Sequence, residues 1–235
     1  MIGIISGLNL ITSSFLITFK KEKSINRYGR VLYYERDKVL FIPRHGADEN
    51  YRLPSEINHQ ANIQCFRDKG VTEIIGINST GSLRKSIRPG AVVVPDDFIM
   101  LYPSPTVCPK NPRHIVPLLD GGIRQRLIKA IEKTGIKPFA YGTYWQTAGP
   151  RLETKAEIRM MAKFAHVVGM TMASEAIIAK EFNIPYASLC SVDNFAHGVA
   201  DKELSDEDII LQAKENAFKI TKIISVYIDE RLKGT

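Results

Sequence analysis

The sequence has little cysteine. Cys65, Cys108 and Cys190 are the three cysteines among 235 residues. This odd number, with no Cys-x-x-Cys spacing, gives no basis for a disulfide framework or a zinc site. We therefore expect a protein of a reducing compartment, the cytoplasm, without a metal.

Long apolar runs and flexible linkers are also missing. The segment from Met1 to Leu16 is apolar, but it lacks the basic start and the small-residue cleavage pattern of a signal peptide. No run reaches the length of a membrane span. No stretch rich in proline, glycine or serine divides the chain, so 235 residues, 44% of them apolar, are expected to form one domain, residues 1–235.

Positive charge is in excess, but it is not clustered. The formal net charge is +7, and the basic residues are scattered among acids rather than gathered in a run with aromatic residues. We expect no nucleic-acid partner. An excess of this size suits a site that attracts an anionic substrate such as phosphate, and it equally suits an ordinary soluble surface.

Strand-like and helix-like segments alternate along most of the chain. Short apolar or β-branched runs predict strands at Ile2–Ile5, Gly29–Tyr34, Lys38–Pro43, Val71–Ile77, Val92–Pro95, Ala140–Gln146, Val167–Val168 and Tyr186–Val192. Helical spacing predicts helices at Pro54–Asp68, Ile123–Thr134, Thr154–Phe164, Ala173–Phe182 and Asp206–Arg231. This order predicts an α/β fold with a mixed central β-sheet flanked by helices. The proline-rich segment 103–117 fits either a lid or a subunit contact.

Polar residues follow several of these strands. Ser6 and Gly7 end the first strand, Arg44 and His45 follow another, and a small-residue loop from Asn78 to Ser82 is expected after Ile77. Ligands of α/β sheets bind at the carboxyl ends of strands, where hydroxyls and backbone N–H groups can hold phosphate. A guanidinium can bind two oxygens at once. Each feature alone also fits a turn or a solvated loop.

The segment Thr147–Thr154 combines a Gly-Pro turn with Glu153 at a helix start. Alone it fits a turn and an acid that stabilises the helix dipole. Together with Gly169–Thr171 and Ser191–Asn194 it indicates a loop that holds a flat polar ligand. Glu175, inside the predicted helix, is expected to be a buried or half-buried acid with a structural role.

An ordered set of motifs covers nearly the whole chain. It consists of Arg44-His45-Gly46 with Pro54, Asn58 and Gln60-Ala61-Asn62, Gly81-Ser82-Leu83-Arg84 with Pro89-Gly90, Ala148-Gly149-Pro150 with Glu153-Thr154 and Ala156-Glu157, and Gly169-Met170-Thr171 with Glu175. This set resembles the trimeric purine nucleoside phosphorylases and the methylthioadenosine and methylthioinosine phosphorylases.

The resemblance implies a nucleoside phosphorylase-like fold and phosphorolysis, in which phosphate attacks C1′ of the ribose and frees the purine. Inorganic phosphate would be the co-substrate, with no other cofactor and no metal. A homo-oligomer, trimer or hexamer, is implied, with a neighbouring subunit helping to complete the site. The implied phosphate-binding residues are Ser6, Arg44, His45, Ser79 and Thr171; the implied substrate-binding residues are Glu153, Met170, Asn194 and Ala196; His45 and Asn194 are the implied catalytic residues.

The base-binding positions favour 6-oxopurines. The adenine-cleaving branch carries aspartates where this chain has Asn194 and Ala196, whereas Glu153 and Asn194 reproduce the pair of the 6-oxopurine branch. A carboxylate can accept the N1–H of hypoxanthine or guanine, and an amide can donate to O6 or N7. Adenine has no N1–H. We therefore predict a preference for methylthioinosine, inosine or guanosine.

The chain also departs from the resemblance. Leu152 stands where the family usually has a phenylalanine, so Phe195 or another aromatic residue would have to replace its stacking. The first loop, Ser6–Asn9, resembles the nucleoside branch, and Leu204–Ile210 leaves the 5′ preference open between hydroxyl and methylthio. A methylthioadenosine phosphorylase, a nucleoside hydrolase and a non-catalytic purine-binding relative stay as alternatives.

Overall fold

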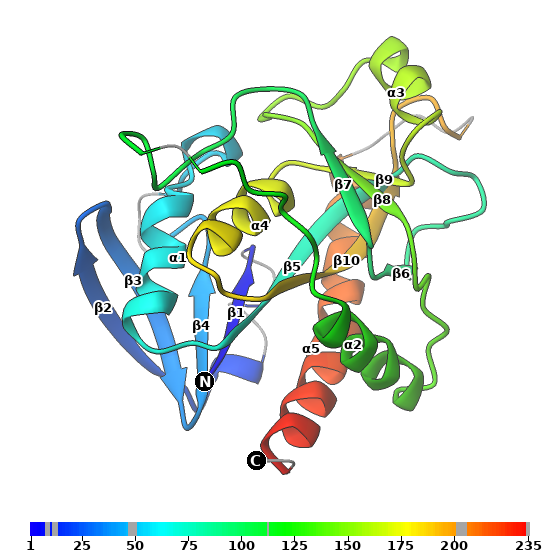
Figure 1. Ribbon diagram of the computed structural model, residues 1–235. Helices are drawn as coiled ribbons and strands as arrows, with labels where there is room; N and C mark the ends of the chain where they lie inside the picture. The colour runs from blue at the N-terminus through cyan, green and yellow to red at the C-terminus, as the bar shows by residue number, and fades with distance from the viewer. Residues whose placement is uncertain (8–9, 11–13, 47–50, 112, 201–205, 234–235) are drawn as a thin grey trace.

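The computed structural model describes residues 1–7, 10, 14–46, 51–111, 113–200 and 206–233. Within this part of the chain, ten strands form one mixed sheet in the order β2-β3-β4-β1-β5-β9-β8-β7, with β10 paired to β5 and β6 paired to β10 (Figure 1). The predicted α/β fold with a mixed sheet is confirmed. The strands are β1 (Ile2–Ser6), β2 (Lys20–Asn26), β3 (Gly29–Arg36), β4 (Val39–Pro43), β5 (Glu73–Ser82), β6 (Val92–Val93), β7 (Asp97–Met100), β8 (Thr143–Gln146), β9 (Val167–Gly169) and β10 (Tyr186–Phe195). The helices are α1 (His59–Asp68), α2 (Gly121–Lys133), α3 (Lys155–Met161), α4 (Met172–Glu181) and α5 (Asp206–Lys233).

Strand β1 lies at the centre of the sheet. It runs parallel to β4 and β5, β5 runs parallel to β10, and every residue of β1 is buried. A continuous apolar run is typical of a strand covered on both faces. Ser6 is in register with Pro43 on β4 and with Ile77 on β5, so the ends of β1 and β4 meet at one edge, beside the longer strand β5.

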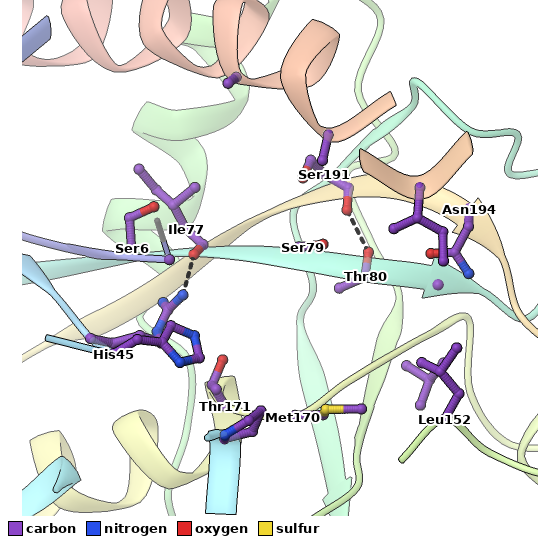
Figure 2. A pocket seen from close by; sticks show the side chains of 18 of the residues that line it. Ser6, His45, Ile77, Ser79, Thr80, Leu152, Met170, Thr171, Ser191 and Asn194 are labelled. Carbon is purple, nitrogen blue, oxygen red and sulfur yellow. Dashed lines mark hydrogen bonds between the residues drawn. The ribbon is translucent and has the colours of Figure 1, made fainter. Parts of the chain in front are cut away.

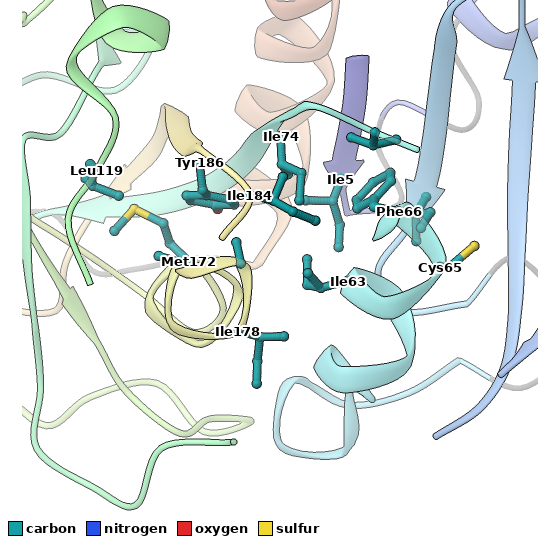
Figure 3. Packing of buried hydrophobic residues seen from close by; sticks show 14 of the residues in the cluster. Ile5, Ile63, Cys65, Phe66, Ile74, Leu119, Met172, Ile178, Ile184 and Tyr186 are labelled. Atoms are coloured by element: carbon teal, nitrogen blue, oxygen red, sulfur yellow. The ribbon is translucent and has the colours of Figure 1, made fainter. Parts of the chain in front are cut away.

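Helices cover both faces of this sheet. Ile5 packs in one cluster with Phe66 of α1 and Ile178 of α4, as Figure 3 shows. The preceding Ile4 belongs to a second cluster, which includes Leu127 of α2 and residues of α5 such as Ile223. Because successive side chains of a strand point to opposite faces, the run Ile4-Ile5 serves both layers.

Two strands were not predicted, and two predicted helices are shorter in the structure, since Thr154–Phe164 is reduced to α3 and Pro54–Asp68 to α1. Strand β2, at one edge of the sheet, is largely polar and lacks the apolar run of a central strand. Strand β7, at the other edge, has only four residues. The predicted helix Pro54–Asp68 is wrong in its first turn. Pro54–Glu56 forms a 3-10 turn, and α1 begins after Asn58, whose side chain accepts a hydrogen bond from Ala61 N at 2.9 Å.

Strands β5 and β10 run further than predicted. The predicted loop at 78–82 is wrong, because these residues continue β5 by pairing with β10 and, at Gly81 and Ser82, with β9. Strand β10 continues to Phe195, with an irregularity in register between Val192 and Asn194. The last residues of both strands therefore border the site as strand rather than loop.

The segment 103–117 has neither helix nor strand among its described residues. Glu181 at the end of α4 holds it, because its carboxylate accepts hydrogen bonds from Thr106 Oγ1 and Val107 N, both at 2.6 Å. Cys65, Cys108 and Cys190 are free thiols. None of the described helices combines the length and the apolar character that crossing a membrane requires.

Candidate functional site

A cavity of about 290 Å³ opens at the edge where the central strands end (Figure 2). The fold brings all of the predicted site residues to it from six separate stretches of the chain. The cavity is lined by Ser6, Arg44, His45, Ser79, Glu153, Met170, Thr171, Asn194 and Ala196, among others. Leu8 and Asn9, part of the predicted first loop, lie outside the described residues, as do Leu204 and Ser205.

Arg44 is buried beneath one end of this cavity. Its Nε donates to Glu175 Oε1 at 2.6 Å, and its Nη2 donates to Glu175 Oε2 at 3.3 Å and to Ile5 O at 3.0 Å. Its Nη1 donates to Ile77 O at 2.8 Å. The expectation that this guanidinium offers two donors to an anion is wrong, because the bidentate face is occupied by Glu175. Of its five N–H groups, one on Nη1 stays for a ligand.

Glu175 confirms the expectation of a buried structural acid. It is 0% exposed, and Tyr186 OH donates to its Oε2 at 2.8 Å. Burial raises the pKa of Tyr186 well above its ordinary value, so this hydroxyl keeps its proton. The ring lies over Gly76, where an added Cβ would be 1.9 Å from the hydroxyl oxygen. Glycine at this strand position therefore admits the partner that completes the Arg44–Glu175 pair.

His45 presents a neutral imidazole to the cavity. Its Nδ1 lies 2.8 Å from the carbonyl oxygen of Arg52, so Nδ1 carries the proton and Nε2 carries a lone pair. The pKa of His45 is lowered to about 4, mainly by burial and also by the nearby Arg44 charge, while the hydrogen bond to the Arg52 carbonyl acts in the opposite direction. The ring stacks on Tyr51 with centroids 4.8 Å apart.

Thr171 stands at the start of α4 with its hydroxyl set as a donor. Asn78 Nδ2 donates to Thr171 Oγ1 at 2.9 Å, which leaves the hydroxyl proton for another acceptor. The helix start is capped by Gln146 of β8, whose Oε1 accepts from Ala173 N at 2.5 Å and from Ser174 N at 3.2 Å. Sequence patterns did not reveal Gln146, because it reaches α4 from a different strand.

Glu153 and Asn194 line the other end of the cavity. Glu153 is buried, and its Oε1 accepts a hydrogen bond from Thr147 Oγ1 at 2.6 Å. Asn194 Nδ2 donates to Phe195 O at 2.8 Å, so one amide proton and the amide oxygen stay for a ligand. His197 Nδ1, also at this end, lies 3.3 Å from the carbonyl oxygen of Glu153. Figure 2 shows Asn194 and Leu152 at the end away from His45.

Met170 lines the cavity between the two ends (Figure 2). Its Sδ would lie 2.5 Å from a Cβ added at Gly149, and Gly149 has a φ of +63°. The backbone of the predicted Gly-Pro turn therefore packs directly against Met170. Only glycine combines this conformation with this close approach.

Ser79 lines the cavity from β5, but its hydroxyl bonds to Asp193 Oδ2. The other oxygen of Asp193 accepts from Asn216 Nδ2 of α5 at 2.7 Å. Asp193 and Asn216 were not predicted. The signal for Asp193 was an acid in a buried strand, directly before Asn194, whereas nothing local marked Asn216.

One side of the cavity is apolar and comes mainly from α5. We call this surface the α5 wall; it consists of Leu10, Ile209, Ala213, Ala217 and Ile220. In Figure 2, α5 passes on the opposite side of β5 from His45, Thr171 and Met170. Leu152 is 47% exposed, and Phe195 is not among the described residues that line the cavity. Of the two alternatives for the stacking, Phe195 or another aromatic residue, the lining of the cavity therefore gives no support to Phe195.

Known proteins share this sequence and fold. A profile described as "Phosphorylase superfamily" matches residues 2–229. The chain is 36% identical over 229 residues to a probable 6-oxopurine nucleoside phosphorylase of Archaeoglobus fulgidus, covering 95% of this chain and 94% of the relative. It is 33% identical over 237 residues to a probable S-methyl-5′-thioinosine phosphorylase of Methanocaldococcus jannaschii, covering 97% and 92%. A methylthioadenosine phosphorylase from Schistosoma mansoni in complex with adenine has a TM-score of 0.85 at 23% identity, covering 100% of this chain and 92% of that chain, which shows a common fold. The sequence match, the sheet order and the polar cavity at the strand ends agree: this chain belongs to the phosphorylase superfamily.

Proposed function

We propose that the protein cleaves the N-glycosidic bond of a 6-oxopurine nucleoside with phosphate, giving the free purine and a ribose 1-phosphate. The observation that carries this proposal is the position of Glu153 and Asn194 at one end of a cavity whose other end holds Arg44, His45 and Thr171. The names of two relatives, a probable 6-oxopurine nucleoside phosphorylase and a probable S-methyl-5′-thioinosine phosphorylase, support the same reaction.

The phosphate end would orient the nucleophile. Arg44 offers one N–H and a fixed positive charge, Thr171 donates its hydroxyl, and Ser6 adds a hydroxyl from the end of β1. The neutral His45 accepts at Nε2, which suits a phosphate that still carries a proton. Phosphate itself attacks C1′, so these residues bind and position it instead of forming a covalent bond.

The base end would stabilise the leaving purine. Negative charge builds on the purine as the glycosidic bond breaks, and the free amide proton of Asn194 can donate to N7 or O6. The Glu153 carboxylate accepts at both oxygens, so Thr147 leaves it able to accept N1–H. Adenine would place a lone pair against this carboxylate, a mismatch that buried sites reject strongly.

The α5 wall supports a methylthio group at the 5′ position. Its described side chains are all apolar, so a thioether buried there loses no hydrogen bond, whereas a 5′-hydroxyl would lose its contact with water. We expect methylthioinosine to exceed inosine in kcat/KM by about tenfold, the value of one or two buried apolar groups.

The test is phosphate-dependent base release from methylthioinosine, inosine and methylthioadenosine. Faster cleavage of methylthioadenosine than of methylthioinosine would contradict the 6-oxopurine assignment, and turnover undiminished without phosphate would favour a hydrolase. Asn194→Asp is expected to raise adenine-nucleoside cleavage relative to hypoxanthine-nucleoside cleavage, because a carboxylate can accept a hydrogen bond from the 6-amino group of adenine but faces the lone pairs of O6 in hypoxanthine.

We also propose a trimeric or hexameric assembly and a cytoplasmic location. Exposed apolar side chains such as Leu101, Tyr141 and Phe164, between 61% and 74% exposed, support association with further copies. The free thiols support a reducing compartment. Light scattering of the purified protein, in which a monomer would contradict the assembly, tests the first point.

A further inference from the structure

Two hydroxyl groups that line the cavity have opposite hydrogen-bond roles: one is a donor to a ligand and the other is an acceptor. Asn78 Nδ2 donates to Thr171 Oγ1 at 2.9 Å, and Asn78 Oδ1 accepts from Ser188 Oγ at 2.8 Å. In this orientation the NH₂ group of Asn78 faces Thr171, and its oxygen faces Ser188. Thr171 receives one hydrogen bond and keeps its proton for a ligand.

Ser79 has the reverse arrangement. It is exposed to the cavity, but its hydroxyl donates to Asp193 Oδ2, and Asp193 is only 2% exposed. A hydroxyl has one proton, so Ser79 presents lone pairs to the cavity and can only accept from a ligand. A hydroxyl in this state cannot donate to a phosphate oxygen.

The hydrogen-bond partners of Asp193 hold its carboxylate in place as the acceptor for Ser79. Asn216 Nδ2 donates to Asp193 Oδ1 at 2.7 Å and to Val192 O at 2.9 Å. The Asn216 oxygen accepts from Lys219 Nζ at 3.4 Å, so turning the amide would place its NH₂ against an ammonium group. Burial raises the pKa of Asp193, while the hydrogen bonds from Ser79 and Asn216 lower it. In its ionised form the carboxylate accepts from both neighbours.

We propose that Ser79 accepts a hydrogen bond from a hydroxyl of the bound substrates. Asp193 is the positioning residue, because it takes the proton of the Ser79 hydroxyl in a hydrogen bond and leaves Ser79 as an acceptor. The inference rests on the proposed function, because the hydroxyl belongs either to the sugar or to a protonated phosphate. The sequence-based prediction that Ser79 binds phosphate stays a prediction, and the proposal adds the direction of its hydrogen bond. Asp193 and Asn216 thereby link the cavity to α5, which carries most of the apolar wall.

The test compares Ser79→Ala, Asp193→Asn and the double variant at pH 8. In Asp193→Asn the new oxygen faces the Asn216 donor and the new NH₂ faces Ser79, so the hydroxyl of Ser79 is turned toward the cavity as a donor. The substrates are inosine and its 2′-, 3′- and 5′-deoxy analogues, together with a phosphate titration. Asp120→Asn is the matched control, since Asp120 caps the distant helix α2 and asparagine caps equally well.

If the donor is a sugar hydroxyl, one deoxy analogue has a kcat/KM about 3- to 10-fold below that of inosine in the unmodified enzyme, as expected for one hydrogen bond. In each single variant the kcat/KM of inosine and that of this analogue differ by less than twofold. The double variant shows no further change in this ratio. If the donor is phosphate, both single variants raise the phosphate KM by about 3- to 10-fold, again without an additional effect in the double variant.

Independent, additive effects of the two substitutions would overturn the proposal, as would Asp193→Asn kinetics equal to those of the unmodified enzyme. If Asp193→Asn does not fold, Ser79→Ala alone decides, because unchanged analogue ratios together with an unchanged phosphate KM refute an acceptor role. Failure of the unmodified enzyme to release base from any nucleoside with phosphate would instead contradict the proposed function.

Discussion

Replacing Glu175 by glutamine perturbs the pair on which the phosphate end depends. Glu175 is 0% exposed and Arg44 is 3% exposed, and two N–H groups of Arg44 and the hydroxyl of Tyr186 point at this carboxylate. Glutamine has the same shape, but its NH₂ group must face one of these donors. The substitution therefore leaves a buried guanidinium without its counter-charge.

Breaking one partner of a buried ion pair costs about 3–5 kcal/mol. A chain of this length loses roughly 2–4 °C of melting temperature per kcal/mol, so we expect Glu175→Gln to melt roughly 6–20 °C below the unmodified protein. Phosphate becomes a substitute counter-ion for Arg44 in the variant. The melting temperature of the variant should therefore rise more on addition of phosphate than that of the unmodified protein.

The assay is thermal unfolding followed by circular dichroism, with and without phosphate at constant ionic strength. Glu181→Gln is the control, because Glu181 is a buried acid on the same helix whose carboxylate accepts from Thr106 and Val107 instead of an arginine. It should melt closer to the unmodified protein and show no added response to phosphate. Melting of Glu175→Gln within about 2 °C of the unmodified protein, with an equal phosphate response, would refute the role given to this pair.

Two further predictions concern pH and the turn beside Met170. Burial lowers the pKa of His45 to about 4 and that of His59 to about 3, so between pH 6.5 and 4 the unfolded chain binds more protons than the folded one. Stability should fall as pH is lowered through this window, by up to about 1.4 kcal/mol per pH unit for each histidine, and His45→Gln should flatten the decline in melting temperature; an unchanged slope would contradict the assignment. Gly149→Ala should cost about 1–2 kcal/mol for the positive φ and displace Met170 toward the cavity, which lowers kcat/KM for the nucleoside; kinetics equal to those of the unmodified enzyme would show that the contact is unimportant.

Local patterns in the sequence were enough to predict the architecture. The run Ile2–Ile5 is apolar throughout, which only a strand covered on both faces requires, and the alternation of such runs with helical periodicity indicated the α/β sheet. The same patterns placed Arg44, Thr171 and Asn194 after or at the ends of strands. In a sheet whose central strands run parallel, such ends meet at one edge, and the cavity lies there, whereas the individual site residues were implied by the resemblance to the nucleoside phosphorylases.

The hydrogen-bond direction of each polar group was decided only by the tertiary structure. Arg44 was predicted to clamp an anion, but its bidentate face belongs to Glu175, 131 residues away in the chain. Ser79 and Thr171 are both hydroxyls beside the same cavity, yet Asp193 makes one an acceptor and Asn78 makes the other a donor. Donor and acceptor roles depend on a partner brought close by folding, and side-chain type and local spacing carry no information about that partner.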